Sequence, residues 1–556
     1  MKIVIRGNAL TSLKGKGFQE IDSFLRYHSD EGPLKLDIVS LNNKQITMLQ
    51  TAISADRDQP GHKASLDAIK LWADIQKNPK NAKCWSLEQA VSIMKQYIST
   101  SPKHLVFYQS ESGIMFPYVV HNIEFHKARN KCPAHVDIDM KCYKKGSIKD
   151  RCITFYSEEA KKSNCMDILT TRNFTLATKE LITAYEKDII EYMRLCNATG
   201  MQILGTGPAE LCTKDYWGSG TVMLEVDGKK SRLVIDNVDE SDDDPSRWKP
   251  IKTEDEAPVT DGSFWDMKRK IGDDSTSDDG NDEVLEVPLH PIILAFNLEK
   301  HQQVWVHIKQ VEDYVYDKEI GSKLVLPDFQ MDLIQLLMQH DHAEFKDIIR
   351  GKSGGSIVLC AGVPGTGKTL TAEVFSEKME RPLYTVQSSQ LGTTATTLET
   401  ELKTVLARAT RWGAILLIDE ADVFIHERGN DINQNAVVGV FLRVLEYYQG
   451  ILFLTTNRDT LIDDAIVSRC TAKVNFQVPT VDQQKKIWEI LAACSGIKIK
   501  ATEITKFATK HPEIVGRDVK GLLKLAHIIA SQRKEPITSD SIEYVMQFKP
   551  THKEKK

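Results

Sequence analysis

The feature that most constrains the fold is a glycine-rich segment in the second half of the chain. Gly362-Val363-Pro364-Gly365-Thr366-Gly367-Lys368-Thr369 fits the phosphate-loop pattern GxxxxGK[ST]. It follows an apolar run expected to be a buried strand, 357–360, and opens a segment with helical patterning, 370–379. In that context the glycines let backbone N–H groups close around phosphates, and the helix N-terminus adds a favourable field. The segment therefore predicts a nucleotide site.

The residue types within this segment suggest individual roles. We expect Lys368 to contact the β- and γ-phosphates and the Thr369 hydroxyl to ligate Mg²⁺. The cofactors predicted are therefore ATP and Mg²⁺. The residues expected to bind them are Gly362, Pro364, Gly365, Thr366, Gly367, Lys368, Thr369, Leu370 and Asp419, with Thr369 and Asp419 as the metal ligands.

Apolar runs alternate with helical patterns from about residue 340 onward. Short buried strands in such an order imply a parallel α/β sheet. No convincing strand appears between 480 and 546, so that part is expected to be helical. The runs are Ile357–Cys360, Leu383–Val386, Ala414–Ile418, Ile451–Leu454 and Val474–Phe476.

Polar and charged residues follow these strands at positions suited to phosphate chemistry. Asp419 and Glu420 end one strand, where we expect Asp419 to hold hydrated Mg²⁺ and Glu420 to polarise the attacking water. Asn457 ends the next strand and is expected to position that water. Arg469 lies twelve residues further on, where it is suited to reach a neighbouring subunit's γ-phosphate. Arg517 opens a later helical segment and is expected to report the state of the nucleotide.

Together these motifs resemble the AAA ATPase family, within the wider AAA+ class. The resemblance runs from about 340 to 546 and covers both Walker motifs, the first sensor (Asn457), the arginine finger (Arg469) and the second sensor (Arg517), in the family's order. Stretches such as 416–424 and 454–458 resemble a group of single-AAA proteins of uncharacterised function, common in fungi and also found in bacteria. The resemblance implies a five-stranded parallel sheet with a helical lid, and a ring, usually hexameric, with ATP at subunit interfaces.

Two positions depart from the family's usual pattern. Many AAA unfoldases carry an aromatic pore loop that grips polypeptide, whereas the corresponding segment here, 388–394, has Leu391-Gly392 and no aromatic residue. Ser468 stands where many relatives place a first arginine, and the triplet Ser468-Arg469-Cys470 resembles that of clamp loaders. The first departure weakens the expectation of a threading mechanism.

The rest of the chain is expected to form further domains. Residues 1–200 are predicted to be a mixed, largely helical domain, and 201–335 a β-rich domain with a hairpin around Asp227-Gly228. An acidic segment, 236–283, interrupts this second domain. It holds 17 acidic and 6 basic residues and is predicted to be disordered or a long loop. Residues 340–479 form the predicted ATPase core, and 480–556 the helical lid and a basic tail. The fold class is thus α/β, an AAA+ sheet and lid preceded by a mixed α/β region.

Composition limits the cellular setting that we expect. The formal net charge is −5, which argues against general coating of nucleic acid. Ten cysteines without a CxxC pair indicate a reduced environment. The sequence shows no apolar run near the roughly 18–20 residues that span a bilayer. We expect a cytoplasmic protein without a membrane partner.

A group of histidines and cysteines lies between residues 121 and 142. His121, His126, Cys132, His135 and Cys142 are ligand types that zinc uses, and Cys132-x-x-His135 resembles half of a zinc site. The other spacings are loose and no second tight pair exists. Ordinary core or surface roles are the favoured interpretation, with zinc as the alternative.

The main functional hypothesis is an oligomeric, Mg²⁺-dependent ATPase that remodels, unfolds or disassembles a protein client chosen by residues 1–330. Two alternatives stay open. One is an ATP-driven nucleic-acid motor or loader, which the clamp-loader-like triplet and a mildly basic balance outside 236–283 suggest. The other is a switch in which ATP sets the state of assembly.

Overall fold

The computed structural model describes most of the chain. The described residues are 2–27, 32–38, 41–77, 86–129, 132–212, 220–239, 249–250, 268–269, 285–327, 330–332, 336, 355–392, 394–458 and 462–548. They form two compact units, one of residues 1–193 and 254–292 and the other of 194–253 and 293–556. Most of the acidic segment 236–283, including Phe264-Trp265, lies outside the described residues.

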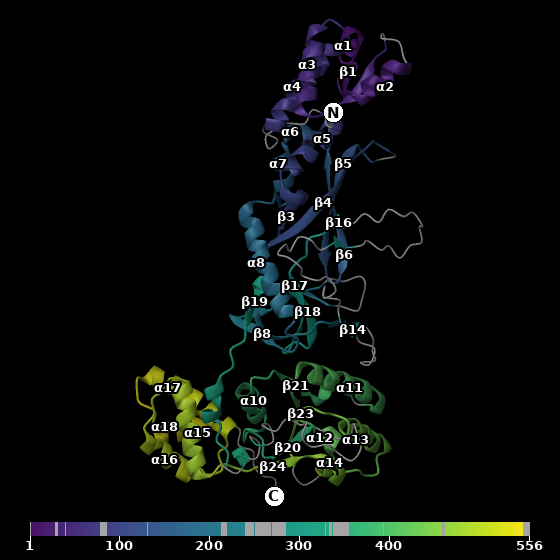
Figure 1. The fold of residues 1–556 in the computed structure, drawn as a ribbon. Coiled ribbons are helices and arrows are strands. Elements are labelled where there is room, and N and C mark those ends of the chain that lie inside the picture. The colour runs from purple at the N-terminus through teal and green to yellow at the C-terminus, as the bar shows by residue number, and fades with distance from the viewer. Residues whose placement is uncertain are drawn as a thin grey trace. The chain divides into compact units, whose positions relative to one another are not determined.

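The first unit combines helices with antiparallel sheets (Figure 1). Strands β1 and β2 pair with each other, and a five-stranded sheet has the order β6-β5-β4-β3-β7. The strands are β1 (Lys2–Ile5), β2 (Leu34–Asp37), β3 (Leu105–Gln109), β4 (Met115–His126), β5 (His135–Lys144), β6 (Ser147–Tyr156) and β7 (Phe174–Leu176). The helices are α1 (Gly7–Ser12), α2 (Gln19–Tyr27), α3 (Asn43–Ala55), α4 (His62–Lys77), α5 (Leu87–Ile98), the 3₁₀ turn η2 (Pro102–His104), α6 (Ser157–Lys162), α7 (Cys165–Thr170) and α8 (Lys179–Cys196). A short pair, β15 (Lys268–Arg269) with β16 (Leu285–Glu286), completes the unit.

Strands β5 and β6 are absent from the sequence predictions, although β5 carries a regular signal. Val136, Ile138, Met140 and Cys142 are buried and alternate with polar residues that are only partly buried. This period of two places the apolar residues on the core face and the polar ones on the other. Strand β4 is long as well, running from Met115 to His126 with a register shift after Val120.

An eight-stranded sheet opens the second unit. Its order is β10-β9-β18-β17-β12-β8-β19, with β11 paired to β12. The strands are β8 (Gln202–Gly205), β9 (Pro208–Leu211), β10 (Thr221–Met223), β11 (Glu225–Val226), β12 (Lys229–Ile235), β17 (Ile292–Asn297), β18 (Gln302–His307) and β19 (Val311–Asp313). The predicted hairpin is confirmed: β11 and β12 flank Asp227 and Gly228, whose φ angles are +53° and +73°. The pair β13 (Val238–Asp239) and β14 (Lys249–Pro250) and the 3₁₀ turns η4 (Ile308–Gln310) and η5 (Lys318–Lys323) follow in the same unit.

The five apolar runs of the second half form one parallel sheet, as predicted. Its order is β21-β22-β23-β20-β24. The strands are β20 (Ser356–Gly362), β21 (Leu383–Gln387), β22 (Ile415–Asp419), β23 (Ile451–Thr456) and β24 (Ala472–Phe476). Their connections are α10 (Lys368–Met379), η6 (Ser388–Gln390), α11 (Ala395–Trp412), α12 (Asp422–Ile425), α13 (Ile432–Leu445) and α14 (Asp464–Arg469). All six residues of β23 are buried, which is the burial of a strand covered on both faces.

Within the described residues 481–548, four helices form the lid, and they gather in one bundle in Figure 1. They are α15 (Val481–Cys494), α16 (Ala501–Lys510), α17 (Gly516–Arg533) and α18 (Ser539–Met546). Trp488, Phe507 and Leu522 are among the residues of their common core. The helical prediction for 480–546 is therefore confirmed.

A buried ion pair joins the eight-stranded sheet to helix α11 of the parallel sheet. Asp236, just after β12, is completely buried. Its two carboxylate oxygens accept hydrogen bonds from Arg411 Nε at 2.8 Å and Nη2 at 2.6 Å. Phe296 of β17 packs its ring against Trp412 at 5.0 Å between centroids. Apolar packing and a desolvated charge pair thus hold these two sheets together.

Candidate functional site

The glycine-rich loop connects β20 to α10 with a backbone that requires glycine. Gly362 has a φ of +138°, and a Cβ atom there would lie 2.0 Å from the carbonyl oxygen of Phe476. Gly367 caps α10 with a φ of +105°. These are conformations that residues with a side chain rarely adopt. The loop therefore has the strand–loop–helix geometry that the sequence pattern predicts.

Lys368 and Thr369 begin helix α10 beneath this loop. The Lys368 ammonium donates to the carbonyl oxygens of Gly362 and Val363, each at 2.9 Å. Burial holds the pKa of Lys368 below its usual value, although nearby negative charge such as the Asp419 carboxylate acts in the opposite direction. The Thr369 hydroxyl donates to Asp419 Oδ1 at 3.1 Å. The loop lysine and threonine thus meet the acidic end of β22, as the order of motifs predicts.

Thr455 organises the acidic residues, and sequence reasoning gave it no role. Its hydroxyl donates to Asp419 Oδ1 at 2.5 Å and accepts from the backbone N–H of Glu420 at 3.0 Å. Its carbonyl oxygen accepts from the N–H of Ala421 at 2.9 Å. Glu420 itself has a φ of +56°, a left-handed conformation that is strained for a residue other than glycine. A hydroxyl residue one place before the strand end, on the strand next to the acidic one, is the signal that could have identified Thr455.

One cavity of about 460 Å³ collects these residues. Asn457, at the end of β23, lines it together with Glu420 and Arg517. The remaining predicted residues on its wall are Pro364, Gly365, Thr366, Gly367, Lys368, Thr369, Leu370 and Asp419. Eleven of the thirteen predicted site residues therefore face one space, whereas Gly362 and Arg469 do not line it.

Apolar residues that sequence reasoning missed form another part of the wall. Leu324 and Val325 precede the parallel sheet, and Ile487, Ile490 and Leu491 come from α15 of the lid. Phosphate-binding groups and an apolar wall in one cavity suit a ligand with a charged and a flat apolar end, such as a nucleotide. The wall residues are distant in sequence from every motif, so only the fold could assign them.

Arg517 lies where the lid meets the glycine-rich loop. Its backbone N–H donates to the carbonyl oxygen of Gly365 at 3.1 Å. A Cβ atom on Gly365, whose φ is +83°, would lie 2.8 Å from the Cβ of Arg517 and 3.0 Å from a methyl carbon of Val515. The absence of a side chain at Gly365 is what allows helix α17 to approach the loop this closely.

Arg469 ends helix α14 outside the cavity. Its Nη1 donates to the carbonyl oxygen of Ala465 at 3.1 Å, and Nη2 lies 3.8 Å from a carboxylate oxygen of Glu446. About a third of its side chain is exposed. Arg469 therefore contacts Ala465 and Glu446 and does not line the nucleotide cavity of its own chain. Its predicted action on a neighbouring subunit stays a prediction.

Comparison with known proteins places this region in a family. Residues 358–478 match the family model of the ATPases associated with various cellular activities, AAA. This part of the chain belongs to the AAA family. The match covers the AAA sheet from β20 to β24, including the glycine-rich loop, the acidic pair and Asn457. The predicted family and fold class are therefore confirmed, whereas the resemblance to a fungal and bacterial group stays a prediction.

Several known proteins are similar to this chain at low identity. A putative 26S proteasome regulatory subunit homolog of Methanothermobacter thermautotrophicus is 26% identical over 203 residues, which are 34% of this chain and 54% of the relative. The ATP-dependent zinc metalloprotease FtsH 1 of Petrotoga mobilis is 26% identical over 240 residues, 40% of this chain and 35% of the relative. FTSH 8 of Arabidopsis thaliana chloroplasts, another ATP-dependent zinc metalloprotease, is 28% identical over 205 residues, 34% and 29% of the two chains. The chain thus spans between about a third and about half of the length of these relatives.

Among the residues that the structure describes, none of the helices combines the length and the apolar character that a bilayer crossing requires.

Proposed function

We propose that this chain is a Mg²⁺-dependent ATPase that works as an oligomer and uses hydrolysis to remodel a protein client. The observation that carries the proposal is one cavity lined both by phosphate-binding groups of the AAA motifs and by apolar residues. Such a cavity suits ATP in size and in chemistry.

The oxygen atoms at the end of β22 fit the proposed metal. The Thr369 hydroxyl and Asp419 Oδ1 lie 3.1 Å apart, and Mg²⁺ prefers oxygen ligands of this kind together with water and phosphate. When bound, Mg²⁺ would neutralise charge on the β- and γ-phosphates. Lys368 would exchange its two loop carbonyls for phosphate oxygens, because its ammonium already lies within the loop.

Glu420 and Asn457 are the residues proposed to handle the attacking water. Both line the cavity, and they follow adjacent parallel strands, so their side chains approach the same edge of the sheet. The Glu420 carboxylate would accept the proton of the water as it attacks, and the Asn457 amide would hold that water in line. Arg517, on the lid, would add positive charge beside the phosphates and link lid position to the nucleotide.

The central experiment separates ATP binding from turnover. Glu420→Gln is expected to bind a fluorescent ATP analogue within about threefold of wild type, because the loop is intact, but to lose at least about a hundredfold in turnover. Lys368→Ala is expected to lose binding itself. Undiminished turnover in Glu420→Gln would refute the role of that carboxylate.

Oligomerisation is proposed because Arg469 does not reach the cavity of its own chain. An arginine that stabilises the γ-phosphate in trans requires a neighbouring copy, and a ring, usually of six in this family, supplies one. Turnover per chain is therefore expected to rise with protein concentration, in parallel with assembly measured by mass photometry.

Mixing two inactive variants gives a sharper test of this shared site. Arg469→Ala retains Glu420, and Glu420→Gln retains Arg469, so mixed rings contain some interfaces with both residues intact. The mixture is expected to regain turnover that neither variant has alone. A mixture that stays inactive although mass photometry shows mixed assemblies would exclude action in trans.

Protein remodelling is proposed as the use of this activity, since the relatives' names concern proteasomal and proteolytic ATPases. Residues 1–330 would select the client. In the segment that corresponds to the family's pore loop, Leu391 is completely buried, so its side chain is not available to contact a polypeptide client. We therefore propose that the client is disassembled or rearranged without being pulled by an aromatic residue in this loop.

The client proposal is tested by stimulation of turnover. A panel of folded complexes and one chemically unfolded protein is added to the full chain, with double-stranded and single-stranded DNA and RNA as a separate arm at low salt. Stimulation by a folded complex but not by nucleic acid supports the proposal. Stimulation by nucleic acid alone, fading as salt is raised, would favour a nucleic-acid motor instead.

A further inference from the structure

Three potential metal-ligating side chains meet on one face of the antiparallel sheet in the first unit. His126 ends β4 and is directly opposite His135 in the register of the two strands. Asp137 follows His135 by two residues on β5. Residues directly opposite, or two apart on one strand, project from the same face of a sheet. Strand register therefore brings together residues that are eleven positions apart in sequence.

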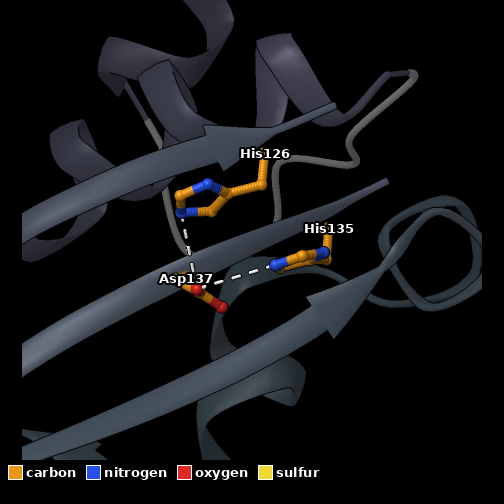
Figure 2. A group of neighbouring side chains, drawn as sticks. All are labelled: His126, His135 and Asp137. Carbon is orange, nitrogen blue, oxygen red and sulfur yellow. Dashed lines mark ion pairs between the residues drawn. The ribbon is translucent and has the colours of Figure 1, made fainter. Parts of the chain in front are cut away.

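The three side chains point toward one another in Figure 2. His126 Nε2 lies 3.5 Å and His135 Nε2 lies 3.7 Å from the same oxygen, Asp137 Oδ2. One ligand atom from each residue lies within 4.8 Å of the other two. The imidazole rings stack at 5.1 Å between centroids, with an interplanar angle of 26°.

These distances do not fit direct hydrogen bonds. An N–H···O bond has its nitrogen and oxygen about 2.7–3.2 Å apart, and both separations here are longer. In tetrahedral coordination with bonds of about 2.0–2.1 Å, two ligand atoms are about 3.3 Å apart. The separations of 3.5 and 3.7 Å are close to that value, so a cation between these atoms requires only small side-chain movements.

Hydrogen bonds on the far side of two of the ligands orient them for this role. His135 Nδ1 lies 2.9 Å from the carbonyl oxygen of Pro133, which can only accept, so Nδ1 carries the proton. In the neutral ring this leaves the Nε2 lone pair facing Asp137. The Thr154 hydroxyl of β6 donates to Asp137 Oδ1 at 2.6 Å, which leaves Oδ2 for the two imidazoles. Metal-binding side chains typically make such hydrogen bonds through the atoms that do not contact the metal.

We infer that His126 Nε2, His135 Nε2 and Asp137 Oδ2 form a site for a divalent transition-metal ion, with Zn²⁺ as the probe. Two imidazoles and one carboxylate suit Zn²⁺ and its first-row neighbours rather than Ca²⁺ or Mg²⁺. About two fifths of the His126 side chain is exposed, so the open side admits water as a further ligand. This metal site is separate from the proposed ATPase function and does not rest on it.

The structure also limits the set of ligands that the sequence suggested. Cys142 is buried on the opposite face of β5, where burial raises the pKa of its thiol to about 11. His121 lies on β4 outside the group. The sulfur of Cys132 is 3.9 Å from His135 Nδ1, the nitrogen that faces away from Asp137. Asp137, which the sequence cluster did not include, takes the place of the cysteines.

The test measures zinc binding to the full chain, with a chromophoric chelator as competitor and elemental analysis for stoichiometry. We expect one Zn²⁺ per chain with a Kd in the micromolar range or below. His135→Ala and Asp137→Asn are each expected to weaken binding at least about a hundredfold. His121→Ala and Asp139→Asn are the matched controls, because they change the same residue types on the same two strands outside the group. These controls are expected to stay within about twofold of wild type.

Two further measurements keep the site assignment falsifiable. Thr154→Val should weaken binding about 10–100-fold, the usual cost of removing a second contact of a metal ligand. In the Co²⁺-loaded chain, we expect visible d–d bands without a thiolate charge-transfer band, since no sulfur belongs to the site. Circular dichroism of each variant confirms that the fold is kept.

Three results would overturn the inference. The first is that the wild-type chain retains no more zinc than the His135→Ala variant. The second is that the His121→Ala control loses as much zinc binding as the site variants. The third is a thiolate band in the Co²⁺-loaded chain that disappears in Cys132→Ser. The last would mean that the metal is bound through Cys132 and not through Asp137.

Discussion

Thr455→Val is the change that tests most directly how the acidic residues of the AAA site are held in place. Valine keeps the shape of threonine but removes the hydroxyl, which donates to Asp419 and accepts from the Glu420 N–H. Thr455 is 2% exposed, so water cannot readily replace either bond. The change therefore removes two polar contacts without creating a cavity.

The size of the effect follows from these two contacts. A hydrogen bond to a charged group contributes about 1.5–3 kcal/mol, and a stranded buried N–H costs about 1–3 kcal/mol. Asp419 keeps its bond from Thr369, and the Glu420 N–H is only partly buried, so the low end of each range applies. We expect the free energy of unfolding to fall by about 2–3 kcal/mol.

Turnover is also expected to fall. The bond from Thr455 helps hold the Glu420 backbone at its strained φ of +56°. Displacing a catalytic group by about 1 Å can cost on the order of a hundredfold in rate. We expect kcat for ATP to drop about 10–100-fold, with a smaller change in the affinity for ATP.

The assay compares Thr455→Val with Thr455→Ser, which restores the hydroxyl without the methyl group. ATP turnover at saturating nucleotide and urea denaturation are measured for both variants. Serine is expected to recover most of the turnover. The proposed role of the Thr455 hydroxyl is refuted if Thr455→Val hydrolyses ATP as fast as wild type. It is also refuted if Thr455→Ser is as slow as Thr455→Val, since the loss would then come from the methyl group.

Three further predictions concern other parts of the second unit. Arg411→Met removes the guanidinium partner of the buried Asp236 carboxylate and should lower stability by about 3–5 kcal/mol in denaturation, whereas Lys403→Met, which removes an exposed pair on the same helix, should cost at most about 1 kcal/mol. Gly365→Ala should raise the Kd of a fluorescent ATP analogue at least about tenfold by forcing the lid from the loop, and an equal effect of Gly413→Ala, which adds strain in open space, would contradict this cause. Burial lowers the pKa of His307 to about 3, so below about pH 6.5 the unfolded chain binds a proton that the native chain does not. The free energy of unfolding should therefore fall by up to about 1.4 kcal/mol per pH unit as the pH is lowered from 6.5 toward 3. In urea titrations at several pH values, His307→Gln should remove this part of the pH dependence.

The sequence determined the AAA sheet and its motifs because the signals there are local. Each apolar run that is buried on both faces forms a strand, and each motif residue stands at or near a strand end, so order along the chain already implies which residues meet. Helix α5 likewise follows from a local signal, since its apolar residues recur at helical spacing. The positions of Asp419, Glu420 and Asn457 at the cavity follow from such local patterns.

Only the tertiary structure decided what depends on contacts between distant segments. Thr455 of β23 donates a hydrogen bond to Asp419 of the adjacent strand β22. Gly365 leaves room for the side chain of Arg517, which belongs to a helix some 150 residues later. In the first unit, His126 and His135 lie near cysteines along the sequence. The register of β4 and β5 instead places them beside Asp137. The physical reason is that side-chain direction along a strand has a period of two, so neighbours in sequence diverge to opposite faces while residues on paired strands converge.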